Sequence, residues 1–97
     1  MKDCGIEKTM KIIGRKWTVL ILRDIFNDKK RFGELLSSLE GISPKTLSLR
    51  LKDLEKNKLI SKKIYKEIPL HVEYSLTEKG KSLSKILKDL RLWGEKY

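Results

Sequence analysis

The stretch of chain from Gly41 to Leu51 constrains the fold most, because it predicts a tight turn that leads straight into a helix. It reads Gly-Ile-Ser-Pro-Lys-Thr-Leu-Ser-Leu-Arg-Leu. Gly41 suits the positive φ that ends a preceding helix. Ser43 is a favoured N-cap residue, and Pro44 is favoured in the first turn of a helix. We expect the new helix to run from about Ser43 to Asn57.

The helix predicted after this turn has two different faces. Its leucines fall on one stripe, at spacings of four and three residues, and at about 100° per residue the basic side chains lie on the opposite side. The stripe consists of Leu47, Leu51 and Leu54, and the opposite side of Lys45, Leu49, Lys52 and Lys56. A helix of this kind docks on a core with one side and presents cations on the other, which is typical of a recognition helix.

Composition narrows the class of protein. The 97 residues predict a single domain over residues 1–97. The net charge of +10, from 23 basic and 13 acidic residues, favours a polyanionic partner, with nucleic acid ahead of an anionic membrane surface. The alternative is a basic protein that has no polyanionic partner. No apolar run approaches the ~18 residues of a membrane span, and the N-terminus lacks a secretory signal, so we expect no membrane partner and a cytoplasmic location.

The remaining sequence predicts three further helices and a hairpin. A short amphipathic helix ends at Gly14, an apolar helix over residues 17–26 is the buried centre, and a third helix carries Phe32 to Leu39. After Lys58 the apolar residues recur at every second position, which predicts two strands. Their inward positions are Ile60, Lys62 and Ile64, then Val72, Tyr74 and Leu76. Pro69 keeps the connecting segment out of the ladder.

The end of the chain predicts one long helix, capped by Thr77, with a seam of coiled-coil type. Together with the first helix it lies outside the core, and a domain this small has little room to bury both apolar stripes. We expect a second copy to cover them in a two-fold homodimer. The alternative is that both stripes fold back on their own chain. The predicted dimer interface is Ile6, Met10, Ile13, Leu83, Ile86, Leu90, Trp93 and Tyr97.

The predicted fold class is therefore mainly α with a small β-hairpin: a winged helix-turn-helix with extra N- and C-terminal dimerisation helices. Short motifs along the chain point to a family. They are Ile12–Trp17, Leu20–Asp24, Arg31–Leu35, Gly41–Leu51, Leu54-Glu55, Val72–Gly80 and Trp93-Gly94. In order and spacing, from Cys4 to about Tyr97, they resemble the HxlR-type family of bacterial winged-helix transcription regulators.

The resemblance implies a dimeric DNA-binding repressor or activator of the cytoplasm, with the outer helices paired across the dimer. Several members of the family are regarded as sensors of oxidants or electrophiles through a cysteine just ahead of the first helix, and Cys4 stands at this position. The chain departs from the family pattern twice. The usual Pro-Pro-Arg before Val-Glu-Tyr is Pro69-Leu70-His71, which replaces an arginine suited to a narrow minor groove. The usual glycine after the recognition helix is replaced by Asn57-Lys58, where Asn57 tolerates the left-handed conformation.

The candidate DNA contacts share a place on the recognition helix, its turn or the hairpin, where double-stranded DNA with a pseudo-palindromic operator would lie. They are Arg31, Ser43, Pro44, Lys45, Thr46, Ser48, Leu49, Arg50, Lys62, Lys63, Lys66 and His71. Lys45 and Arg50 suit guanine or phosphate, and Leu49 suits a thymine methyl group. Arg50 alternatively pairs with an acidic residue of the scaffold. Lys29, Lys30 and Arg31 either clamp flanking phosphates or form an ordinary charged turn.

Cys4 is the only cysteine, which excludes a disulfide within the chain and fits a reducing compartment or one thiol with a specific role. Nearby Lys2, Lys8 and a helix start favour a reactive thiol, whereas Asp3 opposes it; an incidental cysteine is the alternative. His71 is the only histidine and has no ligand cluster around it, so we expect no metal and no cofactor.

The sequence contains neither a nearby nucleophile for His71 nor a Gly-rich phosphate loop, so we predict that the protein is not an enzyme. Two other functions stay open beside the sequence-specific regulator. One is a winged-helix module that binds an acidic protein. The other is a protein that coats DNA without sequence preference. Tyr65 and Tyr74 are expected to pack within the hairpin or the core rather than to stack on bases.

Overall fold

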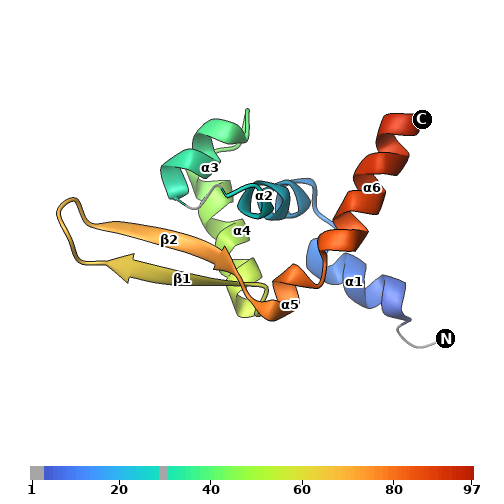
Figure 1. Ribbon diagram of the computed structural model, residues 1–97, viewed down its shortest axis with the longest axis horizontal. Coiled ribbons are helices and arrows are strands. Elements are labelled where there is room, and N and C mark those ends of the chain that lie inside the picture. Colours follow the sequence, from blue (N-terminus) through green and yellow to red (C-terminus); the bar gives the residue numbers. More distant parts are fainter. Residues whose placement is uncertain (1–3, 29–30) are drawn as a thin grey trace.

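The computed structural model describes residues 4–28 and 31–97, and it confirms the predicted class of winged helix-turn-helix. Lys2, Asp3, Lys29 and Lys30, which entered the predictions above, lie outside the described residues. No helix among the described residues is long and apolar enough to cross a membrane. The elements in chain order are α1 (Gly5–Ile13), α2 (Lys16–Phe26), α3 (Phe32–Ser38), α4 (Pro44–Lys56), β1 (Ile60–Tyr65), β2 (His71–Leu76), α5 (Glu78–Lys81) and α6 (Ser84–Lys96) (Figure 1).

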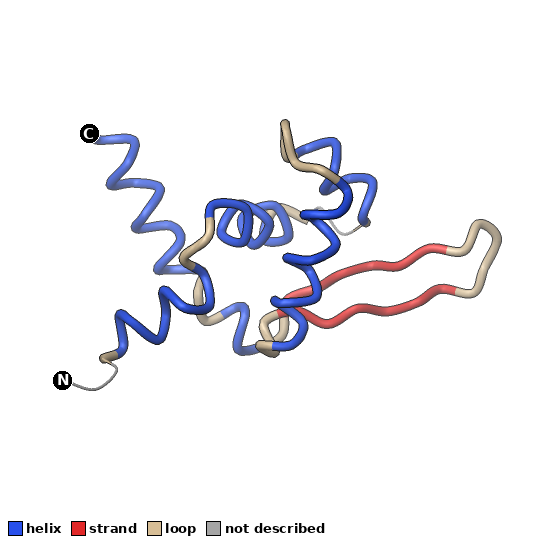
Figure 2. Tube along the Cα trace, turned by 180° about the vertical axis from the view of Figure 1, so that it is seen from behind, coloured by secondary structure: helices blue, strands red, loops and turns tan. Residues whose placement is uncertain are grey.

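The core forms around α2, as the nearly continuous apolar run of that helix predicts. Ile21 and Leu22 of α2 are fully buried, and the leucine stripe of α4 packs against the same core. The molecule measures 51 × 31 × 23 Å. Seen from the front or from behind, the β1–β2 hairpin projects at one end of the longest axis, and α1 and α6 lie at the other (Figures 1 and 2).

The turn between α3 and α4 is built as predicted. Gly41 adopts a φ of +92°, and the hydroxyl of Ser43 caps α4 by accepting the N–H of Thr46 at 3.0 Å. At the other end of α4 the prediction for Asn57 is wrong, because its φ is −82° and the left-handed residue is Lys58, with φ of +64°. The N–H of Leu59 donates to the carbonyl of Leu54, which is the long bond of a Schellman turn and places Lys58 at its left-handed position.

The hairpin is antiparallel, and its register runs from Ile60 opposite Leu76 to Tyr65 opposite His71. This register puts the apolar positions of the two strands on one face at the core end, as predicted. An isolated bridge joins Arg31, just before α3, to Glu73 of β2. The hairpin is therefore attached to the helix-turn-helix at both of its strands, since β1 follows α4 directly.

The single long C-terminal helix expected from the sequence is wrong, because the structure divides it into α5 and α6. In an unbroken helix the N–H of Leu83 would donate to the carbonyl of Lys79. Instead the Ser82 hydroxyl donates to that carbonyl, and the N–H of Leu83 shifts to the carbonyl of Gly80 at 3.1 Å. The break allows α5 to pack on β2 while α6 leaves in another direction.

Candidate nucleic-acid interface

The outer face of α4 points away from the core, and the leucine stripe on the other side packs into it. This is the orientation that the leucine spacing predicts for the recognition helix. Lys45, Lys52 and Lys56 are exposed, and Leu49 keeps 47% of its surface accessible among them. Leu47 on the opposite side is fully buried. About half of this large apolar side chain is uncovered among exposed lysines, and that half is available for a ligand.

The start of α4 presents small polar groups next to this face. The hydroxyls of Ser43 and Thr46 lie 3.0 Å apart, and that of Ser43 also caps the helix. Thr46 and Ser48 are half-buried, whereas Pro44 is exposed. Ser43 and Thr46 therefore shape the helix start, where Ser43, Pro44 and Lys45 are exposed.

Arg50 is held within α4. Its Nη1 lies 3.1 Å from Oδ2 of Asp53, and the residue is half-buried. Asp53 is one turn further along the same helix, so the pair is local and lies at the edge of the exposed face. This is the scaffold pairing that the sequence left open as the alternative for Arg50.

The hairpin cations do not form one cluster. Lys62 is turned back toward α4, where its Nζ lies 4.0 Å from Oε1 of Glu55. Lys63, on the opposite face of β1, places its Nζ 4.9 Å from the centroid of the Tyr65 ring, and Lys66 is exposed beyond the strand. Only Lys63 and Lys66 of the three are therefore directed away from the body of the protein.

Tyr74 lies at the root of the hairpin and packs against the core, as predicted. Burial, and to a smaller extent the negative charge of Glu55, raises the pKa of its hydroxyl above the usual value. Tyr65, by contrast, stacks on His71 with ring centroids 4.7 Å apart and planes inclined by 10°. Both tyrosines thus pack inside the hairpin or on the core.

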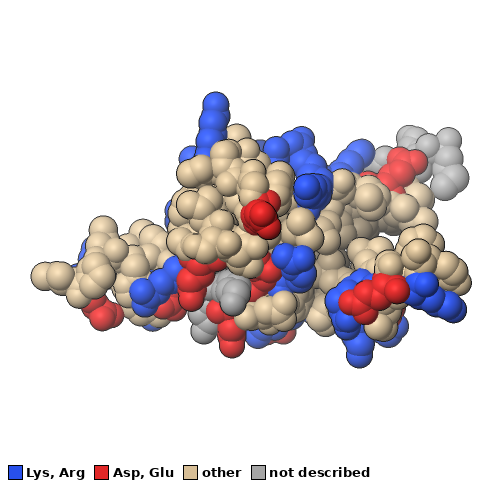
Figure 3. Space-filling view, turned by 90° about the horizontal axis from the view of Figure 1, so that it is seen from above, with Lys and Arg blue, Asp and Glu red and all other residues tan. Residues whose placement is uncertain are grey.

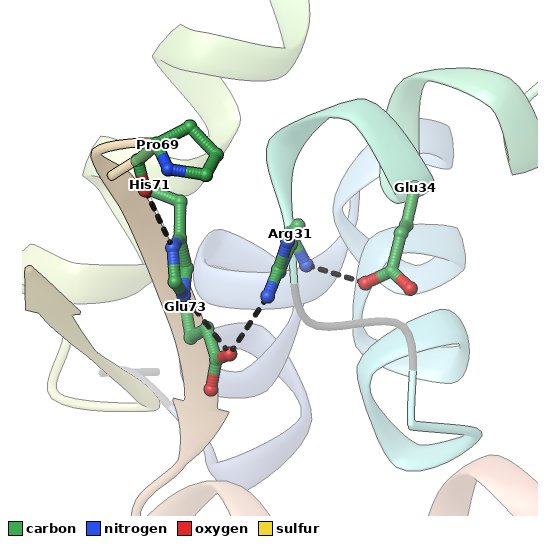
Figure 4. A network of polar contacts seen from close by, with 5 residues as sticks. All are labelled: Arg31, Glu34, Pro69, His71 and Glu73. Atoms are coloured by element: carbon green, nitrogen blue, oxygen red, sulfur yellow. Dashed lines mark hydrogen bonds and ion pairs between the residues drawn. The ribbon is translucent and has the colours of Figure 1, made fainter. Parts of the chain in front are cut away.

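Arg31 and His71, the two predicted contacts at the gap between α3 and the hairpin, meet at Glu73 (Figure 4). Oε2 of Glu73 lies 3.8 Å from Nη2 of Arg31 and 3.4 Å from Nε2 of His71. His71 Nδ1 lies 3.3 Å from the carbonyl oxygen of Pro69, and the N–H of Arg31 donates to Oε1 of Glu34 at 2.8 Å. His71 is therefore directed along the hairpin rather than out from its end, while Arg31 stays half exposed.

The role of Glu73 was missed by sequence reasoning. Alternation along β2 places Glu73 and His71 on one face of the strand, and this alternation could have indicated their contact. Arg31 lies far away in the sequence, and no spacing connects it with Glu73. The Glu73 carboxylate therefore lies beside Arg31, which the sequence predicts to contact phosphate.

Charge is unevenly spread over the surface. In the view of Figure 3, lysine and arginine side chains project along the upper edge of the body, while acidic and basic groups are mixed along the lower edge. The outermost end of the molecule on the hairpin side carries neither charge. The upper edge of the body is therefore the more basic one in this view.

The outer helices α1 and α6 carry the largest apolar side chains that their own chain leaves uncovered. Trp93 is 68% exposed and Tyr97 79% exposed. Ile6, Met10, Ile86 and Leu90 are exposed as well, and so is Leu92, which the spacing did not single out. Leu90 also lines an open groove of about 630 Å³ between α2 and α6, together with Val19, Leu20, Phe26 and Leu87.

Two residues of the predicted dimer interface are less accessible than the others. Ile13 is only 4% exposed and belongs to the core of its own chain. Leu83 is half-buried against the same core. The helical spacing that joined them to the outer stripes is the same for a core and for an interface, so it could not separate the two environments.

Cys4 is the N-cap residue of α1 and is half-buried, with a free thiol. Its carbonyl accepts the N–H of Lys8 at 3.1 Å, so the backbone of Cys4 forms the first turn of the helix. The side chain makes no capping hydrogen bond. Among the described residues, no three His, Cys, Asp or Glu side chains come together as a group that would hold a metal ion.

A helix-turn-helix with an exposed basic second helix, followed by a β-hairpin, defines a transcriptional regulator of the winged-helix type. Residues 12–97 match the sequence model of the HxlR-like helix-turn-helix, and the chain belongs to this family. The family is one of transcription regulators, which is not a class of enzymes.

Several proteins are similar to the chain over nearly its whole length. YdeP of Bacillus subtilis (strain 168), an uncharacterized HTH-type transcriptional regulator, is 40% identical over 96 residues, covering 99% of this chain and 75% of YdeP. The redox regulator HypR in its oxidized form is 35% identical with a TM-score of 0.91, covering 97% of each chain. The reduced form of the transcriptional regulator YodB from B. subtilis is 31% identical with a TM-score of 0.83, covering 99% of this chain and 95% of YodB.

Proposed function

We propose that the chain acts as a homodimeric regulator that binds a pseudo-palindromic operator, with α4 of each protomer in the major groove. The observation that carries this proposal is the outer face of α4, where Lys45 and Leu49 stand exposed beside a well-formed turn. Residues near the start of a recognition helix approach base edges. Lys45 suits guanine or phosphate and Leu49 a thymine methyl group.

The other predicted contacts differ in how accessible they are to DNA. Pro44, Thr46 and Ser48 border the reading face at the start of α4. Lys63 and Lys66 are exposed and bind phosphate, which positions the protein without reading sequence. Arg31, Arg50, Lys62 and His71 each have an acidic partner in the free protein, so they contact DNA fully only if that pair is exchanged.

The proposed dimer forms through α1 and α6. The side chains that support it are exposed, apolar and located at one end of the molecule: Ile6, Met10, Ile86, Leu90, Trp93 and Tyr97. Several large apolar side chains exposed on neighbouring elements are typical of an interaction site. A second copy of the same chain covers both helices at once through a two-fold axis, and the axis then relates two recognition helices to two half-sites.

Regulation through Cys4 is the third part of the proposal. The thiol lies at the start of α1, beside the helix assigned to the dimer interface. HypR, which is described as a redox regulator, shares the fold at 35% identity. A group added to Cys4 would change how α1 packs against the second copy and so change the distance between the two recognition helices.

The test is selection of bound duplexes from a random pool by the purified chain, followed by footprinting. The proposal expects enrichment of one pseudo-palindrome whose half-sites lie about one helical turn or a small multiple apart. Binding without any preferred sequence would instead indicate a DNA-coating protein. An absence of DNA binding at low salt would leave the module that binds an acidic protein.

A further inference from the structure

The outer end of the β1–β2 hairpin is apolar and uncovered. Ile68 is fully exposed and Leu70 is 69% exposed, with Pro69 between them. The hairpin carries them to one end of the 51 Å axis, far from the core (Figures 1 and 2). In the space-filling view this end of the molecule shows no charged atoms at its extremity (Figure 3).

The polar residue next to this tip does not extend the hairpin surface outward. The ring of His71 stacks on Tyr65. It also contacts the Glu73 carboxylate and the Pro69 carbonyl (Figure 4). The aliphatic side chains of Ile68 and Leu70 are therefore uncovered at the tip. The charged residues beside them are the exposed Glu67 and, further back along the hairpin, Lys63 and Lys66.

An aliphatic tip flanked by lysines is complementary to a narrow groove between two rows of phosphates. The minor groove of DNA has this form, with a width of about 6 Å. Proteins that enter it often insert Ile, Leu or Pro between two base pairs, which partly unstacks them and bends the duplex. Two lysines beside one acidic residue leave the hairpin basic, and the net charge of +10 on the chain favours DNA as the occupant.

We infer that Ile68 and Leu70 form an apolar wedge that enters the minor groove next to each half-site and opens a flexible pyrimidine–purine step. This inference rests on the proposed function, because it needs the hairpin to lie on operator DNA. It adds a source of specificity that requires no hydrogen bond to a base. Steps such as TA and CA/TG unstack more easily than AA, so the wedge selects deformable sequence where it enters.

The experiment uses the operator obtained by selection, in the form of a duplex with fluorophores at both ends to report bending. The variant I68S/L70S removes the wedge, and Ile64→Ser is the matched control. Ile64 is an exposed isoleucine of the same hairpin, but it lies within β1 rather than at the tip. Because all three side chains are exposed, the variants keep the fold, which circular dichroism checks.

Native protein and Ile64→Ser should bend the duplex alike, and both should lose roughly tenfold in affinity when the step under the tip is changed to AA. The I68S/L70S variant should bend the duplex less and bind both sequences equally. Its dependence on salt should stay unchanged, since no phosphate contact is lost.

Equal bending and equal step preference in native protein and I68S/L70S would overturn the wedge and leave the DNA-binding proposal standing. A change in the sedimentation of free I68S/L70S would also overturn it, because the tip would then contact a second copy. Failure of the native chain to select any operator would overturn both proposals, and that result is visible before any variant is made.

Discussion

Gly80 of α5 lies directly against the carbonyl oxygen of Leu59, so close that a Cβ at Gly80 would stand 2.1 Å from that oxygen. The same carbonyl accepts the N–H of Thr77 at 3.0 Å, and Lys79 Nζ donates to the carbonyl of Asn57 at 2.9 Å. These contacts join α5 to the turn that follows α4. They fix the root of the hairpin and the point from which α6 departs.

Gly80→Ala should therefore destabilise the protein, because either the backbone of α5 or that of Leu59 has to move. Overpacking of this kind costs about 1–3 kcal/mol. The control is Gly33→Ala in α3, where an added Cβ meets nothing within 4 Å and should raise stability by about 0.5–1 kcal/mol. Urea unfolding of both variants measures the difference. Equal stability of Gly80→Ala and native protein would contradict the close contact.

Alkaline pH should destabilise the fold through Tyr74. Burial raises the pKa of Tyr74 in the folded state, whereas an unfolded tyrosine titrates near ~10. The stability that the protonated Tyr74 hydroxyl contributes is fully present below the pKa of the unfolded state. It is lost as pH rises through the higher pKa of the folded state, because the unfolded chain releases its proton first. Melting temperatures between pH 9 and about 11.5 should fall less steeply for Tyr74→Phe than for native protein.

Tyr65→Phe is the control for this effect, since Tyr65 belongs to the same hairpin but stacks on His71 outside the core. Its melting temperature should follow the native slope. All other side chains are common to the proteins compared, so only the difference between the slopes is informative. Parallel slopes for Tyr74→Phe and native protein would argue against the burial of this hydroxyl.

The proposed dimer should dissociate when its apolar surface is interrupted. Burying one large aliphatic side chain contributes about 2 kcal/mol, and two-fold symmetry makes Leu90→Asp act twice. Sedimentation should show a dimer for native protein and mostly monomer for Leu90→Asp at micromolar concentration. Leu70→Asp, which places the same charge on an exposed leucine of the hairpin, should remain dimeric. A monomeric native chain would refute the interface.

Base reading and phosphate binding by α4 and the hairpin should separate in binding assays. Lys45→Ala and Leu49→Ala should lower operator affinity by about 1–3 kcal/mol and affinity for random DNA much less. Lys63→Ala and Lys66→Ala should weaken both alike and make the salt dependence shallower. Lys85→Ala, an exposed lysine of α6 that pairs with Asp89, should change neither. Equal loss on both DNAs for Leu49→Ala would remove it from the reading face.

The features that could be predicted from the sequence depend on local signals. The turn at Gly41, the cap at Ser43 and the two faces of α4 each follow from residue type and short spacing. Two other features could not be read from the spacing of apolar residues. The break after α5 depends on the Ser82 hydroxyl, which donates to the Lys79 carbonyl. The contact of Arg31 with Glu73 joins segments that are far apart in the sequence. Periodicity shows that a face is apolar, but not what covers it.

The last prediction concerns Cys4 as the site of regulation. It is the only thiol, so oxidation within one chain cannot form a disulfide. Its products are a sulfenic acid, a mixed disulfide with a small thiol, an adduct with an electrophile, or a disulfide to a second copy. Each adds a polar or bulky group at the start of α1, where the half-buried side chain has limited space.

A coupling of about 1–3 kcal/mol between Cys4 and the DNA-binding faces would change operator affinity by roughly 5- to 150-fold. Operator binding is measured with and without a mild oxidant or a quinone, for native protein and for Cys4→Ser. Native protein should respond and Cys4→Ser should not, while both bind the operator equally when reduced. If the oxidant leaves native binding unchanged, or changes Cys4→Ser to the same extent, Cys4 is not the sensor. Operator binding through α4 would be unaffected by that result, because it depends on a different surface of the molecule.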